Sequence, residues 1–452
     1  MKKIFTLVFS CVTAIAAMAQ TGAATGPTDW GLSGSGTEAD PYQIKTADDF
    51  TKMAQSCTAS HKGTGEYFKM MNDIDFGGKA TSPVQFPAIG KDGNAQIANI
   101  AYGFDGTFDG DNHTIKGIYH TNNGKDAAGK YNALFGCIDK NGVVKNIIMS
   151  KDNHIESYSY VGTIASLNMG KIENCVNNAD VTAANTSAGG ICGYMVNRCG
   201  TIENCKNYGN VTSMTYAAGI CGGSQPDKTI TTYAYLVDEC ENHGNISTKN
   251  GVGSAGIAGA FSGMVKNCTN YGNIDDTKGT AKTKQYTAGI VSCTSYPVAI
   301  DGCVNSGTVN GVKNVAGIVA YVMKGENTAV AIKGCTNNGM VKGQDYVAGI
   351  AANSARTKGV VSIESCTNNG EVSSTATTAN IGNLRGTDNI ALGNGNVIAE
   401  TLTHYNLDDQ ESTGISNVVV DKQTVKNGKY IKNGRVVIIK DNNEYSLGGI
   451  KY

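Results

Sequence analysis

A single unit repeats seven times between Val161 and about Val372, and this repetition limits the possible folds more than any other feature of the chain. The first half of the unit reads small residue, Gly and Ile, as in AGICG at 218 and AGIVA at 316. The second half reads Cys-x-Asn-x-Gly-x-(Val/Ile), as in KNCTNYGNI ending at Ile274. Successive repeat cysteines are 28 to 35 residues apart, which fits one coil of two or three short strands with variable loops. The repeat therefore predicts an all-β chain folded as a right-handed parallel β-helix.

In such a stack, equivalent residues of neighbouring coils lie about 4.8 Å apart, so each repeated residue type becomes a row. Cysteine is small and commonly buried, and we expect its row to fill a narrow interior between rows of Ile and Val. An Asn amide can donate to one coil and accept from the next, so the Asn row should satisfy a tight turn. The Gly two residues after each Asn predicts a turn with positive φ, with Ala179 as the one exception. The rows are Cys175, Cys205, Cys240, Cys268, Cys303, Cys335 and Cys366; Asn177, Asn207, Asn242, Asn270, Asn305, Asn337 and Asn368; and Gly209, Gly244, Gly272, Gly307, Gly339 and Gly370.

Composition agrees with this architecture and narrows the possible partners. The 58 Gly, 6 Pro and 1 Trp suit turn-rich, repetitive β structure. A formal net charge of −1 leaves no basic field for nucleic acid, so no nucleic-acid partner is predicted. The parallel side chains of a cysteine row point alongside one another, so we expect free thiols. No CxxC pair occurs, and we predict neither a metal site nor a cofactor.

The N-terminus has the features of a signal peptide. Lys2 and Lys3 precede an apolar run, and the run ends at Ala17-Met18-Ala19, the small-x-small form that a signal peptidase reads. We expect residues 1–19 to be removed, which leaves an odd 13 of the 14 cysteines. The apolar run is short, so no stable transmembrane segment is predicted and the protein should be secreted or on the outer cell surface.

The remaining chain divides by pattern. Thr46 and Asp49 form a capping box before Phe50 and Met53, which predicts a short helix that caps the stack. We expect residues 20–130 to form the cap and first irregular coils, residues 131–380 the β-helix repeats and residues 381–412 a transition. Residues 413–452 should form a small C-terminal β segment, either a meander or a hairpin.

The spacing of Gly, Cys and Asn resembles the GLUG-motif repeat of bacterial surface proteins of Bacteroidetes type. The resemblance covers about residues 130–372 and implies a secreted, adhesin-like role without naming a ligand. Some members of that family are attached to metallopeptidases that cleave immunoglobulin A. None of the six His residues here is followed by Glu, so the HExxH zinc signature is absent and that activity is not implied.

A row of tyrosines is the candidate binding surface. Tyr160, Tyr216, Tyr286 and Tyr346 stand four residues before the repeat Ile, and Ser187, Gly253 and Asn314 occupy the intervening units. Tyrosine then falls on alternate coils, about 10 Å apart and too far for direct stacking within the row. An exposed row would suit contacts with a glycan or a host protein, whereas the alternative is that the rings cover loops.

Other candidate sites have structural explanations that we favour. An acidic cluster could bind Ca²⁺ or cleave a glycan, but Asp and Asn beside Gly are ordinary turn residues. His113 and His120 are expected at the surface, and no catalytic residue is predicted. The acidic cluster comprises Asp73, Asp75, Asp105, Asp109 and Asp111.

These patterns favour a non-catalytic extracellular binding or adhesion protein that presents a repetitive β-helix face to a glycan or host surface protein. The alternative is a β-helix polysaccharide lyase or glycoside hydrolase, which needs Asp, Lys, Arg or His clustered on adjacent coils. The four arginines are scattered, at Arg198, Arg356, Arg385 and Arg435. A third possibility is a spacer that carries the C-terminal segment.

Overall fold

A computed structural model describes most of the chain from residue 30 to residue 407. It describes residues 30–90, 102–120, 131–226, 235–279, 285–323, 330–358, 360–377, 379–403, 405 and 407, with the backbone alone for 295–297. Further along, it describes the backbone of residues 428–432, 435–440 and 443–446. The expected signal peptide lies outside these residues.

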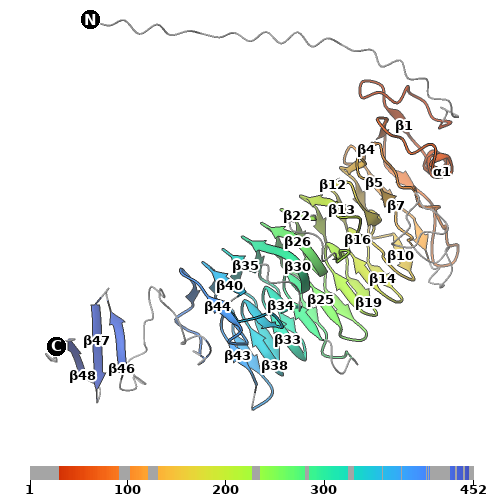
Figure 1. Ribbon diagram of the computed structural model, residues 1–452. Helices are drawn as coiled ribbons and strands as arrows, with labels where there is room; N and C mark the ends of the chain where they lie inside the picture. The colour runs from red at the N-terminus through yellow and green to blue at the C-terminus, as the bar shows by residue number, and fades with distance from the viewer. Residues whose placement is uncertain are drawn as a thin grey trace, which may run out of the picture.

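The described chain winds through four parallel sheets, and each coil adds strands to them in turn (Figure 1). The sequence prediction of a parallel β-helix is therefore confirmed. The first and largest sheet has 18 strands and receives one or two strands from each coil. Its strands are β1 (Tyr42–Ile44), β2 (Tyr67–Met70), β4 (Thr107–Asp109), β7 (Phe135–Ile138), β8 (Val143–Lys145), β11 (Ala165–Asn168), β12 (Lys171–Glu173), β16 (Cys192–Met195), β17 (Thr201–Glu203), β21 (Cys221–Gly223), β22 (Leu236–Asp238), β26 (Ala258–Lys266), β30 (Val291–Asp301), β34 (Val319–Val322), β35 (Val330–Lys333), β39 (Ala351–Ser354), β40 (Val361–Glu364) and β44 (Ile390–Leu392).

The second sheet holds 11 short strands, and most of them carry the repeated Asn as their second residue. They are β3 (Ile74–Asp75), β5 (Thr114–Lys116), β9 (Ile148–Met149), β13 (Val176–Asn177), β18 (Lys206–Asn207), β23 (Glu241–Asn242), β27 (Thr269–Asn270), β31 (Val304–Asn305), β36 (Thr336–Asn337), β41 (Thr367–Asn368) and β45 (Val397–Ile398).

The third sheet has nine strands, and in the repeats they begin at the Val or Ile that ends the Cys-Asn-Gly motif. They are β6 (Tyr119–His120), β10 (His154–Ser157), β14 (Val181–Ala183), β19 (Val211–Ser213), β24 (Ile246–Thr248), β28 (Ile274–Asp275), β32 (Val309–Asn310), β37 (Val341–Gly343) and β42 (Val372–Ser374).

The fourth sheet has seven strands and leads each coil back to the first sheet through the small residue-Gly-Ile motif. Its strands are β15 (Ser187–Gly189), β20 (Tyr216–Ala218), β25 (Gly253–Ala255), β29 (Tyr286–Ala288), β33 (Lys313–Ala316), β38 (Asp345–Ala348) and β43 (Ile381–Gly382). Because β43, β44 and β45 pair in register with the preceding coil, the stack continues into the segment that the sequence assigned to a transition.

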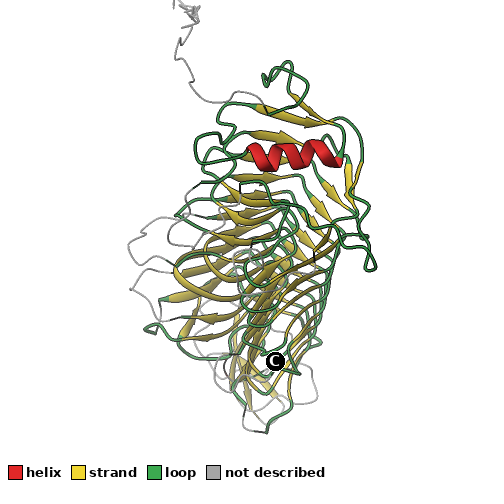
Figure 2. Ribbon diagram, turned by 90° about the vertical axis from the view of Figure 1, so that its right-hand side faces the viewer, coloured by secondary structure: helices red, strands yellow, loops and turns green. Residues whose placement is uncertain are grey.

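The predicted capping helix is present as α1 (Ala47–Ser56) at the N-terminal end of the stack (Figure 2). Thr46 accepts from the Asp49 backbone N–H, and the Asp49 carboxylate accepts from the Thr46 N–H, so the capping box is confirmed. Phe50 is fully buried and contacts the rings of Phe76, Phe86 and Phe108 at centroid distances of 5.5–5.9 Å. The helix therefore covers apolar rings that would otherwise end the stack in water.

Beyond the stack, three antiparallel strands form a separate small sheet in the order β46-β47-β48. Of the meander and the hairpin that the sequence left open for the C-terminal segment, the described strands form the meander. Its strands are β46 (Gly428–Lys432), β47 (Arg435–Lys440) and β48 (Asn443–Ser446).

The repeated asparagines form one continuous hydrogen-bonded ladder. The amide of Asn270 donates to Asn305 Oδ1 at 2.8 Å, and its own Oδ1 accepts from Asn242 at the same distance. The same amide group also donates to the carbonyl of Gly272, two residues on. All seven side chains from Asn177 to Asn368 are fully buried and close their turns in this way, and each of the first six donates to the next Asn. The ladder therefore satisfies a buried turn, as the sequence predicts.

The glycines that follow the ladder are needed for a reason other than backbone conformation. Gly209 and Gly272 belong to a row in which no described member has a positive φ, so that expectation is wrong. A Cβ on Gly272 would instead overlap the carbonyl oxygen of Gly244 in the preceding coil. Close approach between coils excludes a side chain here.

Positive φ occurs instead at the residue before each repeat cysteine. This residue turns the chain from the first sheet into the second, and its φ lies between 49° and 61°. Asn tolerates this conformation better than most other residues, which explains its frequency in the row. The row is Asn174, Asn204, Glu239, Asn267, Gly302, Gly334 and Ser365.

The repeat cysteines are free thiols with no exposed surface. Their Sγ atoms donate to backbone carbonyls two residues earlier, as Cys268 does to Lys266 at 3.1 Å. Some also accept from the coil before, as Cys205 does from the Cys175 N–H at 3.4 Å. Burial raises the pKa of Cys205 and of Cys268. The row fills the interior beside the repeat Ile residues, which are also fully buried.

We predict that Asn270→Ala or Asn305→Ala lowers the free energy of unfolding by about 1–3 kcal/mol, because each change leaves buried donors and acceptors unpaired. Chemical denaturation followed by circular dichroism measures the effect. Ser306→Ala is the matched control, because Ser306 is exposed in the same turn. Unchanged denaturation midpoints for both Asn variants would contradict the ladder.

We also predict that the repeat cysteines stay unmodified by a thiol reagent until the protein is denatured, because a buried thiol has little thiolate character. Cys199 is partly exposed and should react first. Mass spectrometry after labelling with and without denaturant identifies the modified residues. Repeat cysteines joined in disulfides across coils would contradict this prediction.

Candidate functional site

The fourth sheet meets the first sheet along a narrow line, which we call the seam. The outer sides of the two sheets approach so closely there that several positions accept only a small residue. A Cβ on Gly193 would overlap the backbone of Tyr160 and Val161, and one on Gly222 would lie 2.6 Å from the carbonyl oxygen of Gly193. Outward-facing alanines such as Ala288 form apolar clusters here that are separate from the main core. The Ile of the small residue-Gly-Ile motif thus packs in the interior, and its small residues pack in the seam.

The four predicted tyrosines fall in one row along the seam. Tyr216 pairs with Gly253, and Gly253 pairs with Tyr286 in the next coil. The register of β33 and β38 places Tyr346 level with Asn314, and a bridge from Val161 to Ala188 places Tyr160 level with Ser187. The predicted alternation of tyrosines with other residues is therefore confirmed.

The row is less exposed than an open binding surface would be. Tyr286 is only 7% exposed, and Tyr160, Tyr216 and Tyr346 are half-buried. The rings pack against residues on the first-sheet side of the seam, including Cys293, so they are partly structural. Burial raises the pKa of Tyr286 to about 12 and also raises that of Tyr160 and Tyr216. Their hydroxyl groups are therefore neutral donors at physiological pH.

Two further tyrosines complete the row from the opposite side of the seam. Tyr194 on β16 contacts Tyr160 with ring centroids 5.1 Å apart, and Tyr321 on β34 stacks on Tyr286 at 4.8 Å. Each stands three residues after the repeat Ile, in a unit that lacks Tyr four residues before it. The sequence shows this pattern only when the residue four before the Ile and the residue three after it are compared in every unit. The residue four before the Ile does not reveal it alone.

The combined rings make a zigzag along the seam, which we call the tyrosine row. Its members are Tyr160, Tyr194, Tyr216, Tyr286, Tyr321 and Tyr346. Between Tyr216 and Tyr286 the row is interrupted, since that coil has Gly253 on one side and Ala260 on the other. The Tyr216 ring leans into this gap, and a Cβ on Gly253 would lie 2.7 Å from it. Before the row, Tyr131 stacks on Tyr160 at 6.0 Å.

Beneath the interruption lies a buried carboxyl group, Asp276, which is 2% exposed. Its Oδ1 accepts from the Thr248 N–H at 2.7 Å, the Thr248 hydroxyl at 3.0 Å and the Ser254 hydroxyl at 2.8 Å. Its Oδ2 accepts from the Thr287 hydroxyl at 3.3 Å. Burial raises the pKa of Asp276 to about 6 despite these donors, because no cation compensates the charge in the described surroundings. The group joins three strands of neighbouring coils.

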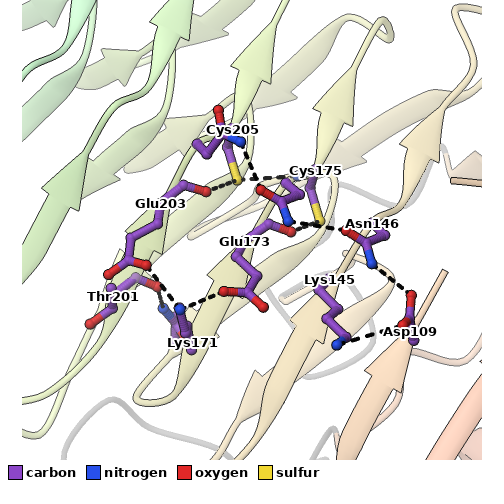
Figure 3. Close-up of polar contacts among 12 residues, drawn as sticks. Asp109, Lys145, Asn146, Lys171, Glu173, Cys175, Thr201, Glu203 and Cys205 are labelled. Carbon is purple, nitrogen blue, oxygen red and sulfur yellow. Dashed lines mark hydrogen bonds and ion pairs between the residues drawn. The ribbon is translucent and has the colours of Figure 1, made fainter. Parts of the chain in front are cut away.

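A third feature is a charged row on the outer side of the first sheet (Figure 3). Lys171 contacts both Glu173 and Glu203, and Lys145 pairs with Asp109 at 3.6 Å. Further along the stack, Lys266 pairs with Asp238 and Lys333 with Glu364. The charges in these pairs offset one another, so the row is better suited to hold coils in register than to supply a catalytic acid and base.

The acidic cluster near the N-terminal end is also engaged within the chain. Asp109 accepts from Asn146 at 2.8 Å, Asp105 accepts from Thr64 at 2.8 Å, and Asp73 accepts from the Thr114 N–H. Asp75 pairs with Lys116 and Asp111 with Lys69. Across the described ranges, no three His, Cys, Asp or Glu side chains are arranged to hold a metal ion.

His113 and His120, both expected at the surface, differ in exposure. His113 is partly exposed and its Nδ1 lies 3.3 Å from Asp73 Oδ1, whereas His120 is only 3% exposed. The expectation is wrong for His120, which lies on β6 and pairs with Ile155 on β10.

Two arginines are structural rather than clustered. Arg356 is buried and donates to the Met323 carbonyl, and Arg385 is buried and donates to the carbonyls of Leu407 and Ile390. They hold loops at the C-terminal end of the stack. These contacts leave neither guanidinium on an open face where a polysaccharide carboxylate could reach it.

Comparisons with known proteins find relatives of limited extent. No family model matches the chain. It is 29% identical over 164 residues to "Halomucin" of Haloquadratum walsbyi, covering 36% of this chain and 2% of that protein. It is 29% identical over 143 residues to a "Putative Gly-rich membrane protein" of Evansella cellulosilytica, covering 31% of this chain and 15% of that protein. The chain thus spans a small fraction of either relative's length.

A solved structure described as a "putative immunoglobulin A1 protease from Bacteroides ovatus" is similar with a TM-score of 0.45 and 20% identity. The similarity covers 60% of this chain and 77% of that one. In the part of this chain that the structure describes, no helix has the length and apolar character of a membrane span.

We predict that stability falls as the pH rises from about 4 to about 6, because the pKa of Asp276 is higher in the folded than in the unfolded protein. The stabilisation from the protonated Asp276 is complete below the pKa of the unfolded protein, about 4. It is lost as the pH rises through the pKa of the folded protein, about 6. A shift of about two units corresponds to about 3 kcal/mol. Asp276→Asn should therefore gain stability relative to the parent between pH 4 and pH 7, as measured by denaturation at each pH. An equal offset at every pH would contradict the assignment.

Proposed function

We propose that this chain is a secreted or outer-surface repeat protein of the GLUG type that binds a glycan or a host surface protein without catalysis. The observation that carries the proposal is the tyrosine row, in which ring after ring recurs along one seam of a rigid stack. Aromatic side chains held at a fixed spacing present contact area at low cost in conformational entropy. The GLUG resemblance and the names of the two relatives support a role at the cell surface.

Repetition is what makes the tyrosine row suitable for binding. One partly exposed tyrosine edge with its hydroxyl group contributes a weak contact, worth about 0.5–1.5 kcal/mol. An extended ligand that follows the seam meets several such contacts, and their sum gives useful avidity. The neutral hydroxyl groups favour hydrogen bonds with sugar hydroxyls or peptide groups over ionic contacts.

Placement outside the cell follows from the N-terminal sequence. Met1 to Ala19 has the composition of a signal peptide, and we propose that the mature chain begins at Gln20. Buried free thiols are compatible with an oxidising compartment, because neither oxidants nor partner thiols reach them without unfolding.

The alternative, a lyase or hydrolase, is not favoured. Such an enzyme needs a general acid and base beside a charge-stabilising group on adjacent coils. Most of the described charged residues of the first sheet are paired with each other, and two of the arginines are buried at the C-terminal end. Release of new reducing or unsaturated ends from a polysaccharide panel would support the alternative.

We predict that replacing Tyr160, Tyr216 and Tyr346 together with Ala weakens binding to the protein's glycan or protein ligand by tenfold or more. Tyr286 is left in place because it is buried. The ligand is first found with a glycan array and immobilised host surface proteins, and affinity is then measured by biolayer interferometry. The matched control is the triple Tyr→Phe variant, which keeps the packing.

Circular dichroism and thermal unfolding accompany both triple variants. Normal binding by a folded Ala variant would contradict the role of the row. If the Ala variant unfolds, the Phe variant decides, because loss of binding with intact packing assigns the hydroxyl groups to the ligand. A Phe variant with unchanged affinity would then leave the rings in a structural role.

A further inference from the structure

A second aromatic arrangement lies on the outer side of the second sheet, away from the seam. Tyr208, His243 and Tyr271 each follow a ladder asparagine, in three successive coils. The His243 ring stacks on Tyr208 at 4.5 Å and on Tyr271 at 4.6 Å, with interplanar angles of 15° and 18°. We call these three residues the outer stack. Its spacing is set by the strand spacing of the sheet.

Unlike the tyrosine row, the outer stack is open to solvent. Tyr208 is 46% exposed and Tyr271 is 50% exposed, and they are the only two aromatic residues among the exposed large hydrophobic side chains of the described residues. Single exposed rings are common, but a contiguous group of exposed rings is typical of an interaction site. The rings are nevertheless ordered, since each is held by its stacked neighbour and by a backbone fixed through the Asn ladder.

The outer stack ends abruptly on both sides. In the preceding coil the equivalent residue is Asn178, which folds back to donate to the Met149 carbonyl at 3.0 Å. In the following coil it is Ser306, a small and exposed residue. One face of the Tyr271 ring is therefore directed toward the level of Ser306. No side chain as large as a tyrosine ring occupies that position. A six-membered ring of about the thickness of an aromatic ring fits one strand spacing.

Polar groups flank the outer stack on both sides. On one side Glu241 accepts from His243 Nε2 at 2.9 Å and pairs with Lys206 at 3.1 Å. On the other side Asn210, Asn245 and Asn273 form an exposed row in which each Oδ1 accepts a backbone N–H of the next coil, the last from Thr308. Within the described residues the Nδ2 groups of Asn245 and Asn273 have no acceptor. They are available as donors.

We propose that the outer stack binds a pyranose ring of a neutral polysaccharide, with the sugar seated on Tyr271 above Ser306. The apolar C–H face of a pyranose packs on an aromatic face, and its hydroxyl groups are donors and acceptors at the rim. The Asn273 amide and the Thr308 hydroxyl group, which lie at the levels of Tyr271 and Ser306, match those two roles. The balanced Lys206–Glu241 pair disfavours a strongly anionic ligand. The ligand class rests on the proposed function of surface binding, but the site is distinct from the seam.

The experiment is affinity electrophoresis and isothermal titration calorimetry of the whole mature chain with soluble polysaccharides. The probes are a galactomannan, a xylan, a mixed-linkage β-glucan and, as the anionic comparison, polygalacturonate. We expect at least one neutral polysaccharide to bind. Tyr271→Ala should weaken that binding about tenfold or more, and Tyr271→Phe should retain it.

Ser306→Tyr is the most discriminating variant. It removes no ring and adds one at the level where the sugar is expected, so it should block binding as strongly as Tyr271→Ala. Met340→Ala is the matched control, because Met340 is an exposed apolar residue outside the outer stack. All four variants alter exposed side chains, and unchanged thermal unfolding confirms that the coils are intact.

The outcomes separate the two sites. Loss of binding in Tyr271→Ala and Ser306→Tyr, with normal binding in the triple Tyr→Ala variant of the seam, supports the outer stack. Loss in the seam variant alone overturns this inference and leaves the proposed function standing. If no polysaccharide binds, the inference is overturned. The proposed function then depends on binding to the immobilised host surface proteins. Tighter binding to polygalacturonate than to every neutral probe also overturns it.

Discussion

The hydrogen bond from one buried Asn amide to the next determines the arrangement of the whole stack. Each of these bonds joins two coils at a fixed level, and each Asn also closes its own turn through the carbonyl two residues on. A slip of one residue would break every bond of the row and leave buried polar groups unpaired. The register is therefore strongly specified. Glycine at the following turn is a consequence, because that position leaves no room for a side chain once the coils are this close.

A fixed register turns single residues into continuous surfaces. The tyrosine row and the outer stack both arise in this way, but they differ in what surrounds them. Seam rings are packed on the opposite sheet, so they stabilise the fold and offer only edges and hydroxyl groups. Rings of the outer stack have no covering layer and offer a face. One chain thus carries two aromatic surfaces that expose different parts of their rings, on sides of the solenoid that are formed by different sheets.

The stack is not uniform along its length. Gly253 interrupts the tyrosine row, and in the same coil Ser254 stands where most other coils place an apolar residue inside. Asp276 then satisfies Ser254 and Thr287 in the interior. A buried carboxylate without a cation is costly, so this coil is a local weak point in an otherwise apolar and amide-bonded column. The interruption also divides the tyrosine row into two segments, and a ligand that follows the seam would meet it between Tyr216 and Tyr286.

The sequence by itself determined the solenoid, the level of each coil, the capping helix, and the residues that share a row, because these follow from repetition at the strand spacing. It also placed Tyr160, Tyr216, Tyr286 and Tyr346 in register. Only the tertiary structure decided what each row faces. The sequence pattern does not contain the angle at which two sheets meet, so it could not reveal that the seam buries Tyr286 or that it brings Tyr194 and Tyr321 into contact with the other rings. The same limit applies to the glycines. Their positions are evident in the sequence, but the carbonyl oxygen that excludes a side chain belongs to another coil, and only folding brings it there.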